Sequence, residues 1–146
     1  MGEMFMQGRV KWVENALFLG QSGSGHSVVM DGPPESGGQN LGLRPMEMLL
    51  LGAGGCSVFD VVAILKKSRQ PVIACEVALS AERADTVPKV FTKINMHFIV
   101  TAKASIKEVQ VERAIKLSAE KYCSASIMLA HSVEMTHSFE IKIEQV

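Results

Sequence analysis

Apolar and polar positions alternate in three short runs at the start of the chain, over residues 5–13, 16–20 and 26–31. Alternation of this kind is typical of half-buried strands, and the Asn, Gly and Ser residues between the runs favour tight connections. The pattern therefore predicts an antiparallel three-stranded meander. A loop rich in glycine and proline is predicted to follow over residues 32–40.

An almost uncharged stretch begins at Pro45 and predicts helix. Proline suits the first turn of a helix because its missing N–H would be unpaired there, and Glu47 complements the positive end of the helix dipole. The glycines within residues 52–55 predict a break. A second helix is then predicted from Cys56 to Lys67. Because it is apolar on almost every side, we expect it to be a buried central helix.

Alternation returns over residues 72–83 and 91–101, which predict neighbouring antiparallel strands. A helix is predicted next, with Ser105 as its N-cap and Glu108 at the spacing of a capping box. The helical stripe ends near Tyr122.

A turn with a short helical piece follows over residues 123–129, and residues 137–144 alternate as a closing strand. The order of elements predicts an α+β domain whose strands are segregated from a buried helix.

Composition narrows the class of protein. A chain of 146 residues is most simply one domain, and its formal net charge of zero favours neither nucleic acid nor an anionic membrane as a partner. The longest apolar run, residues 46–53, is shorter than the roughly 20 residues that span a bilayer. The first residues show no leader pattern.

Three cysteines are an odd number, which favours free thiols in a reducing compartment, so we expect a cytoplasmic protein.

Two of the three cysteines stand out as candidates for chemistry. Cys56 is expected at a helix N-terminus, where the dipole favours a thiolate, although a small buried hydrophobic role fits equally well. Cys123 follows a predicted helix and lies 67 positions later. Two such thiols could form a reversible disulfide. They lack a nearby Cys or His at the spacing that zinc sites favour, so metal binding is discounted. Cys75 alternates with apolar residues and is expected in the core.

Charged residues around Cys56 offer partners for it. Glu47 lies among apolar residues and is either the exposed point of an amphipathic face or a group paired with a cation. If it is buried, its carboxylate needs a partner such as Arg44, three positions away, or Arg9 on the first strand. Asp60 lies four positions after Cys56 on the same helical face. There it would either oppose formation of the thiolate or face solvent.

The stretch from Pro45 and Glu47 through the apolar run to Cys56, with Cys123 near the other end of the chain, resembles the OsmC/Ohr family of osmotically inducible and organic hydroperoxide resistance proteins. The resemblance covers essentially the whole chain in its order of elements. Ser124 follows the second cysteine where the family commonly has proline, which marks a divergent branch.

The resemblance implies an OsmC-like fold, with antiparallel β-sheets around the buried central helix, in an intertwined homodimer. It also implies a thiol-dependent peroxidase that reduces organic hydroperoxides to alcohols. Cys56 would be the peroxidatic residue and Cys123 the resolving one, and the two would form a disulfide. Glu47 would hold an arginine, Arg9 or Arg44, over the thiolate. A dithiol would be the reductant, because no flavin, haem or metal signature is present.

Two other functions remain open from the sequence. The protein could be a non-enzymatic dimer that senses redox state through reversible oxidation of its thiols. It could also be a structural dimer that binds a small apolar ligand between helices.

Overall fold

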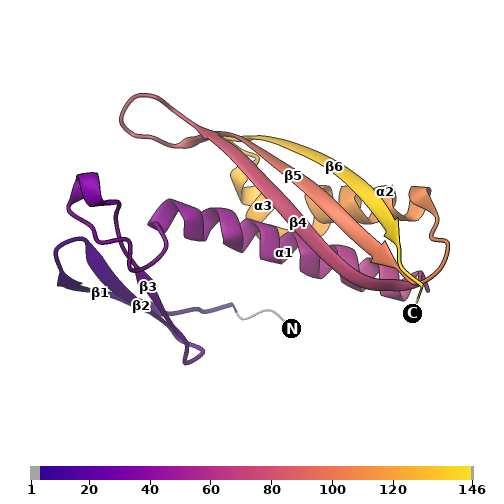
Figure 1. Cartoon of the computed structure of the whole chain (residues 1–146), viewed down its shortest axis with the longest axis horizontal. Helices are drawn as coiled ribbons and strands as arrows, with labels where there is room; N and C mark the ends of the chain where they lie inside the picture. Colours follow the sequence, from indigo (N-terminus) through magenta and orange to yellow (C-terminus); the bar gives the residue numbers. More distant parts are fainter. Residues whose placement is uncertain (1–3, 146) are drawn as a thin grey trace. The chain divides into compact units, whose positions relative to one another are not determined.

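The structure is a computed structural model that describes residues 4–145. Two compact units divide the chain: one ends at Leu49 and the other begins at Leu50. Both contain a three-stranded sheet, and Figure 1 follows their elements along the sequence. The architecture is α+β, as the sequence predicts.

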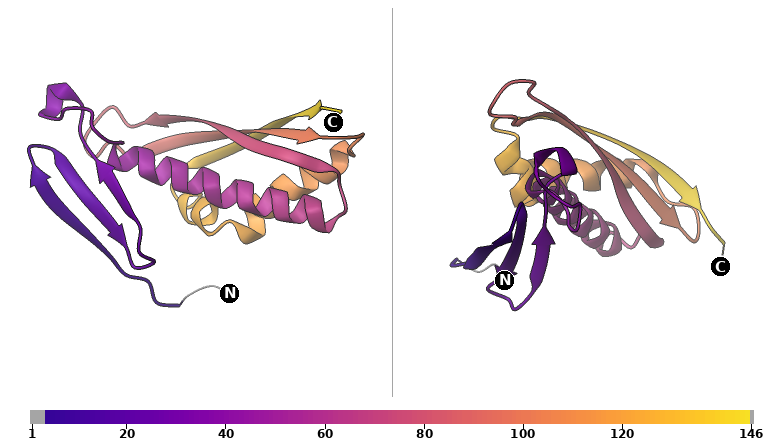
Figure 2. Two further views of the ribbon diagram at one scale, coloured as in Figure 1. Left: turned by 60° about the horizontal axis from the view of Figure 1, so that its bottom comes forward. Right: turned by 60° about the vertical axis from the view of Figure 1, so that its left-hand side comes forward.

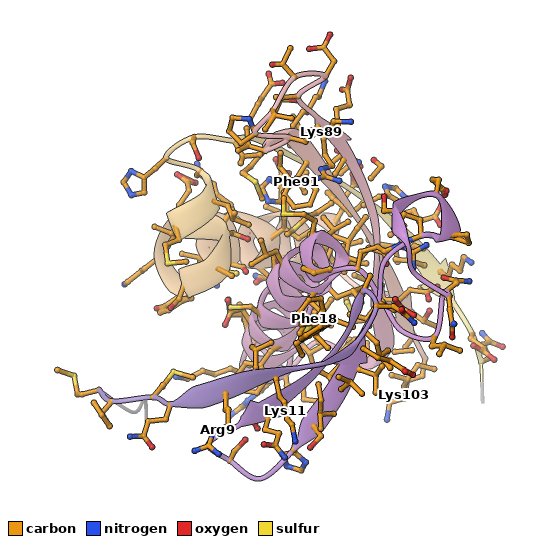
Figure 3. The ribbon with its side chains drawn as sticks, turned by 90° about the vertical axis from the view of Figure 1, so that its left-hand side faces the viewer. Arg9, Lys11, Phe18, Lys89, Phe91 and Lys103 are labelled. Atoms are coloured by element: carbon orange, nitrogen blue, oxygen red, sulfur yellow. The ribbon has the colours of Figure 1, made fainter. Side chains whose placement is uncertain are left out.

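The N-terminal unit contains the predicted meander. Its strands β1 (Gly8–Glu14), β2 (Leu17–Ser22) and β3 (Ser27–Met30) form an antiparallel sheet in the order β1-β2-β3. Arg9 and Lys11 alternate with apolar residues on β1 and point from the same face of this sheet (Figure 3).

A buried aspartate organises the loop after β3. Asp31 is 1% exposed, and its carboxylate accepts hydrogen bonds from the backbone N–H groups of Gly32, Gln39 and Leu41. Burial alone would raise the pKa of Asp31, but these three bonds hold the pKa below its ordinary value. The predicted loop contains a single turn of 3-10 helix, η1 (Pro34–Ser36), and otherwise lacks regular structure up to the helix.

One helix, α1 (Pro45–Lys67), replaces the two predicted around Cys56. The predicted break over residues 52–55 is therefore wrong. Each interior glycine costs a helix about 1 kcal/mol, but packing of one helix face outweighs such propensities. The buried residues of α1 lie mainly at intervals of four, namely Ala53, Gly54, Ser57, Val61 and Leu65.

The second unit contains a sheet of mixed direction. Strand β4 (Val72–Arg83) pairs antiparallel with β5 (Phe91–Ala102), as predicted. Strand β6 (Glu134–Ile143) pairs with β5 in parallel, so the expectation of purely antiparallel sheets is wrong for this pair. A parallel partner needs a long crossover, which the residues between β5 and β6 supply.

The crossover consists of α2 (Glu108–Leu117), the π-helical turn η2 (Ser118–Tyr122) and α3 (Ser124–Leu129). The capping box predicted from Ser105 is wrong. The N-cap of α2 is Lys107, whose backbone N–H donates to the side chain of Gln70.

The core of the second unit lies between its sheet and the three helices, which cover one face of the sheet (Figure 2). Alternate residues of β5 face the helices, and Phe98 among them is 0% exposed. Gly54 permits the close approach of α1, because a Cβ there would come within 2.8 Å of the Leu79 side chain on β4. The larger of the fully buried apolar side chains of this core are Val61, Leu65, Ile94, Met96, Phe98, Val100 and Val111.

Only one face of α1 is buried within the chain, although the sequence predicts a buried central helix. Leu51 is 55% exposed and Phe59 is 74% exposed. Gly52 and Gly55 belong to the same helix, and both have open space beside them. By length and composition alone α1 could cross a membrane, contrary to the expectation from residues 46–53. The buried residues of α1 form a stripe that packs against the sheet, as they do in a helix of a globular core.

Candidate thiol site

Helix α1 and the crossover bring together two cysteines that are far apart in the sequence. The sulfur atoms of Cys56 and Cys123 and a carboxylate oxygen of Asp60 all lie within 4.8 Å of one another. Both thiols are free, with Cys56 half-buried and Cys123 fully buried. A disulfide between them would require the sulfur atoms to approach to about 2 Å.

Cys123 is held by polar contacts inside the protein. It is the N-cap of α3, and its sulfur accepts a hydrogen bond from the backbone N–H of Ser126 at 3.3 Å. The thiol can donate to the Ser126 hydroxyl at 3.2 Å. Burial raises the pKa of Cys123, its hydrogen bond and charge interaction with Cys56 raise it further, and the contacts with Ser126 oppose this rise. The Cys123 thiol is therefore shielded from solvent, and its raised pKa disfavours the thiolate.

Asp60 belongs to a chain of hydrogen bonds that links α1 to the π-helical turn. The Ser118 hydroxyl donates to Asp60 Oδ2 at 3.0 Å and lies 3.1 Å from the buried Ser57 hydroxyl. Asp60 thus lies beside Cys56, as the four-residue spacing predicts, and is half-buried. The alternative in which its carboxylate simply faces solvent is wrong. The turn η2 positions Ser118 and leads directly into Cys123.

Cys56 lies eleven residues after the first residue of α1, in the middle of the helix. Activation by a helix N-terminus, which the predicted break would have created, is therefore wrong. The immediate polar surroundings of Cys56 come instead from Cys123 and Asp60. Cys75 is separate from this cluster on β4, where it is half-buried rather than fully in the core. Burial, followed by the charge of Glu76, raises the pKa of Cys75 to about 11.

The other predicted site residues belong to the N-terminal unit. Glu47 accepts a hydrogen bond from the backbone N–H of Arg44 at 2.8 Å and so caps the start of α1. The Arg44 guanidinium donates to Asn40 and to the carbonyl of Gly42. Arg9 is exposed on β1. Within residues 4–145, no ion pair joins Glu47 to either arginine.

Two cavities adjoin the thiol cluster from the side of the crossover. One of about 450 Å³ is lined by Asp60 together with Lys67, Arg113 and Tyr122. Another of about 650 Å³ is lined by Ser126 and by residues of α2 and β6. The first cavity gives small molecules a route to the Asp60 side of the cluster.

Sequence reasoning missed the serines that support the cluster. The sequence analysis gives no role to Ser57, Ser118 or Ser126. A small polar residue at a position that otherwise carries apolar residues was the available signal for Ser118. Its partner could not be found from the sequence, because 58 residues separate it from Asp60.

Comparisons with known proteins place the chain in a family. Residues 37–138 match the family described as OsmC-like protein. The chain is 54% identical to Protein YhfA of Escherichia coli strain K12 over 136 residues, which cover 93% of this chain and 98% of that protein.

Solved structures show the same fold. A hypothetical protein from Aquifex aeolicus is 32% identical with a TM-score of 0.84, and the match covers 98% of this chain and all of that one. A protein from Legionella pneumophila, described as an organic hydroperoxide resistance protein OsmC, is 13% identical with a TM-score of 0.74 over 96% of this chain and 99% of its own. The fold, the family match and the relatives agree that this chain belongs to the OsmC family.

Proposed function

We propose that the protein is a thiol peroxidase that reduces organic hydroperoxides to alcohols. The observation that carries the proposal is the proximity of the Cys56 and Cys123 sulfur atoms, within 4.8 Å of each other on separate elements. Family membership adds support, since the relative from Legionella pneumophila is described as an organic hydroperoxide resistance protein.

The exposure of the two thiols supports the roles that we propose for them. Cys56 is half-buried and so accessible, whereas Cys123 is fully buried and its pKa is raised. The Cys56 thiolate attacks the outer oxygen of the hydroperoxide, the O–O bond breaks, and the alkoxide takes a proton and leaves as the alcohol. Cys56 becomes a sulfenic acid.

Cys123 completes the oxidation. Its thiolate attacks the Cys56 sulfur, an S–S bond forms, and the hydroxyl group of the sulfenic acid leaves as water after taking a proton. An external dithiol then reduces the disulfide and is itself oxidised. We assign Glu47, with Arg9 or Arg44, to orientation of the thiolate, as the family resemblance implies. A reducing cytoplasm is the compartment that suits this cycle.

Thiol titration and intact mass, after addition of one equivalent of cumene hydroperoxide to the reduced protein, test the proposal. We expect loss of two thiols and of two hydrogen atoms in mass, with peptide mapping to a bond between Cys56 and Cys123. The reaction should be faster than that of a free model thiol. An equal rate would contradict the enzymatic function and favour a dimer that senses redox state or binds a ligand.

We further propose that two copies of the chain associate through the exposed face of α1. The open spaces beside Gly52 and Gly55 flank the exposed side chains of Leu51 and Phe59, and a second copy could fill them. An apolar face of this kind is typical of interfaces between subunits.

Replacing Phe59 by arginine is expected to weaken the dimer, because it places an unpaired charge in an apolar interface. The dissociation constant should rise by roughly thirtyfold or more, as for other central aromatic residues of interfaces. Sedimentation velocity over a dilution series measures it. Val109→Arg on α2 is the control, since Val109 is also exposed, at 65%. An unchanged dissociation constant for Phe59→Arg would place the interface elsewhere.

A further inference from the structure

We propose that Cys56, Asp60 and Cys123 form a binding site for one zinc ion per chain when the thiols are reduced. The sequence alone argues against a metal, because neither Cys56 nor Cys123 has a neighbouring ligand at the spacing of zinc sites. The fold nevertheless brings the three donors close together. Cys56 and Asp60 lie on α1, and Cys123 is the residue that caps α3.

The donor set suits zinc. Two thiolates and a carboxylate are ligands of a borderline-soft divalent ion, with bonds of about 2.3 Å to sulfur and about 2.1 Å to oxygen. Tetrahedral geometry would place such donors about 3.5–3.8 Å apart. The donors of this cluster lie within 4.8 Å of one another, so closure by about 1 Å or less completes three positions. A water molecule can take the fourth.

Hydrogen bonds from neighbouring residues orient two of the donors, as is usual for metal ligands. Ser118 donates to Asp60 Oδ2, which leaves the other carboxylate oxygen for an ion, and the Ser126 N–H donates to the Cys123 sulfur. Such outer contacts orient ligands and strengthen metal binding. The cavity of about 450 Å³ beside Asp60 provides a path of entry.

Charge balance points to a cation as well. Within residues 4–145, no nitrogen of Lys, Arg or His lies within 4.0 Å of the Asp60 carboxylate. Lys67 and Arg113 line the neighbouring cavity but form no ion pair with the Asp60 carboxylate. With both thiols ionised, the cluster would carry three negative charges within a few ångströms, and a divalent ion offsets two of them.

Zinc binding would depend on the oxidation state of the thiols, a consequence that rests on the proposed peroxidase function. Oxidation by a hydroperoxide converts the two zinc-bound thiolates to a disulfide, and the two electrons reduce the hydroperoxide, with two protons from solvent, to alcohol and water. The disulfide removes two of the three ligands, so the ion leaves. Binding itself does not depend on this reaction and is tested without peroxide.

The test is a titration of the reduced, metal-free full chain with Zn²⁺ against a chromophoric chelator, in the absence of oxygen. Co²⁺ serves as a second probe, because its visible absorption reports thiolate ligation and tetrahedral geometry. We expect one ion per chain, bound more tightly than by free dithiothreitol. Bound zinc should also slow alkylation of Cys56 by iodoacetamide while leaving Cys75 unaffected.

Variants separate the three donors from bystanders. Cys75→Ser, which removes the cysteine outside the cluster, should bind like the unaltered protein. Asp60→Asn keeps the side-chain shape and both thiols, and its zinc affinity should fall about tenfold or more. Cys56→Ser should lose the thiolate-to-cobalt absorption of a two-thiolate site. Circular dichroism establishes that each variant is folded. Unchanged affinity in Asp60→Asn, or wild-type affinity no greater than that of dithiothreitol, would overturn the three-donor site.

Discussion

Replacing Cys56 by serine is expected to lower kcat/KM for organic hydroperoxides by roughly 10³-fold or more, to the level of the background reaction. The reason is that a serine hydroxyl is a poor nucleophile toward the O–O bond, whereas a thiolate is an effective one. The half-buried Cys56 is the accessible member of the pair, and Cys123 has no exposed surface through which it could take over the role. Consumption of cumene hydroperoxide with a dithiol reductant gives the rates.

Two further cysteine variants make the result specific. Cys75→Ser should retain the activity, since Cys75 lies on β4 outside the cluster and burial raises its pKa to about 11. Cys123→Ser should accept the first oxidation but accumulate sulfinic acid at Cys56, because no thiol resolves the sulfenic acid. Full activity in Cys56→Ser would exclude the proposed mechanism, and loss of activity in Cys75→Ser would show that the wrong cysteine had been assigned.

Truncation of Phe98 to alanine is expected to reduce the free energy of unfolding by about 3–5 kcal/mol. Phe98 is completely buried at the centre of β5, and its ring stacks on that of His137 with the centroids 6.5 Å apart. The substitution leaves a cavity between the sheet and the helices that the strand backbone cannot close. Denaturant unfolding of the reduced protein at one fixed chain concentration measures the change, because the proposed dimer would make stability depend on concentration.

A conservative change at the same position provides the control. Phe98→Leu retains most of the apolar volume and should cost less than about 1.5 kcal/mol. If alanine and leucine destabilised the protein equally, the cause would be loss of the ring interaction with His137 rather than a cavity. A cost below about 1 kcal/mol for alanine would contradict close packing at this position.

The strands were predictable because their sequence signal is local. Residues 72–83 alternate and form β4 with the same bounds, and β5 differs from its prediction by one residue at its C-terminal end. The direction of β6 was not predictable from alternation, because the same pattern serves parallel and antiparallel partners. The length of the helical connection before β6 was compatible with a parallel pair, but it does not require one.

The continuity of α1 shows why local propensity failed at the thiol site. The glycines at positions 52, 54 and 55 weaken a helix, and the sequence analysis ended it there. In the fold, Gly54 is needed for close packing against β4, and the stripe through Ala53 and Ser57 is buried. Tertiary packing therefore decided the structure. Since Cys56 then lies in mid-helix, the predicted source of its activation was lost with the break.

The pairing of Cys56 with Cys123 was expected from the family resemblance, not from the spacing of the two residues. Spacing alone allowed a disulfide and discounted a metal, and it offered no means of choosing a partner across 67 positions. Asp60 was correctly placed on the face of Cys56 by helical periodicity. Its hydrogen bond with Ser118 joins two helical segments and could not be seen in either one.

The parallel pairing of β5 with β6 has a consequence for how the thiol pair comes into being. Strand β4 meets β5 across a short connection, but Lys93 of β5 pairs with Glu134 of β6, 41 residues further along the chain. Non-local pairings form more slowly because a longer loop must be closed first. Cys123 lies within that loop, in the crossover.

During synthesis the two sulfur atoms therefore begin apart. At about 5–20 residues per second, a ribosome adds Cys123 roughly 3 to 13 seconds after Cys56. Until the crossover packs beside α1, the two sulfur atoms are not held near each other. The proposed redox pair therefore depends on a long-range step of folding, and a chain that has not completed this step cannot form the pair.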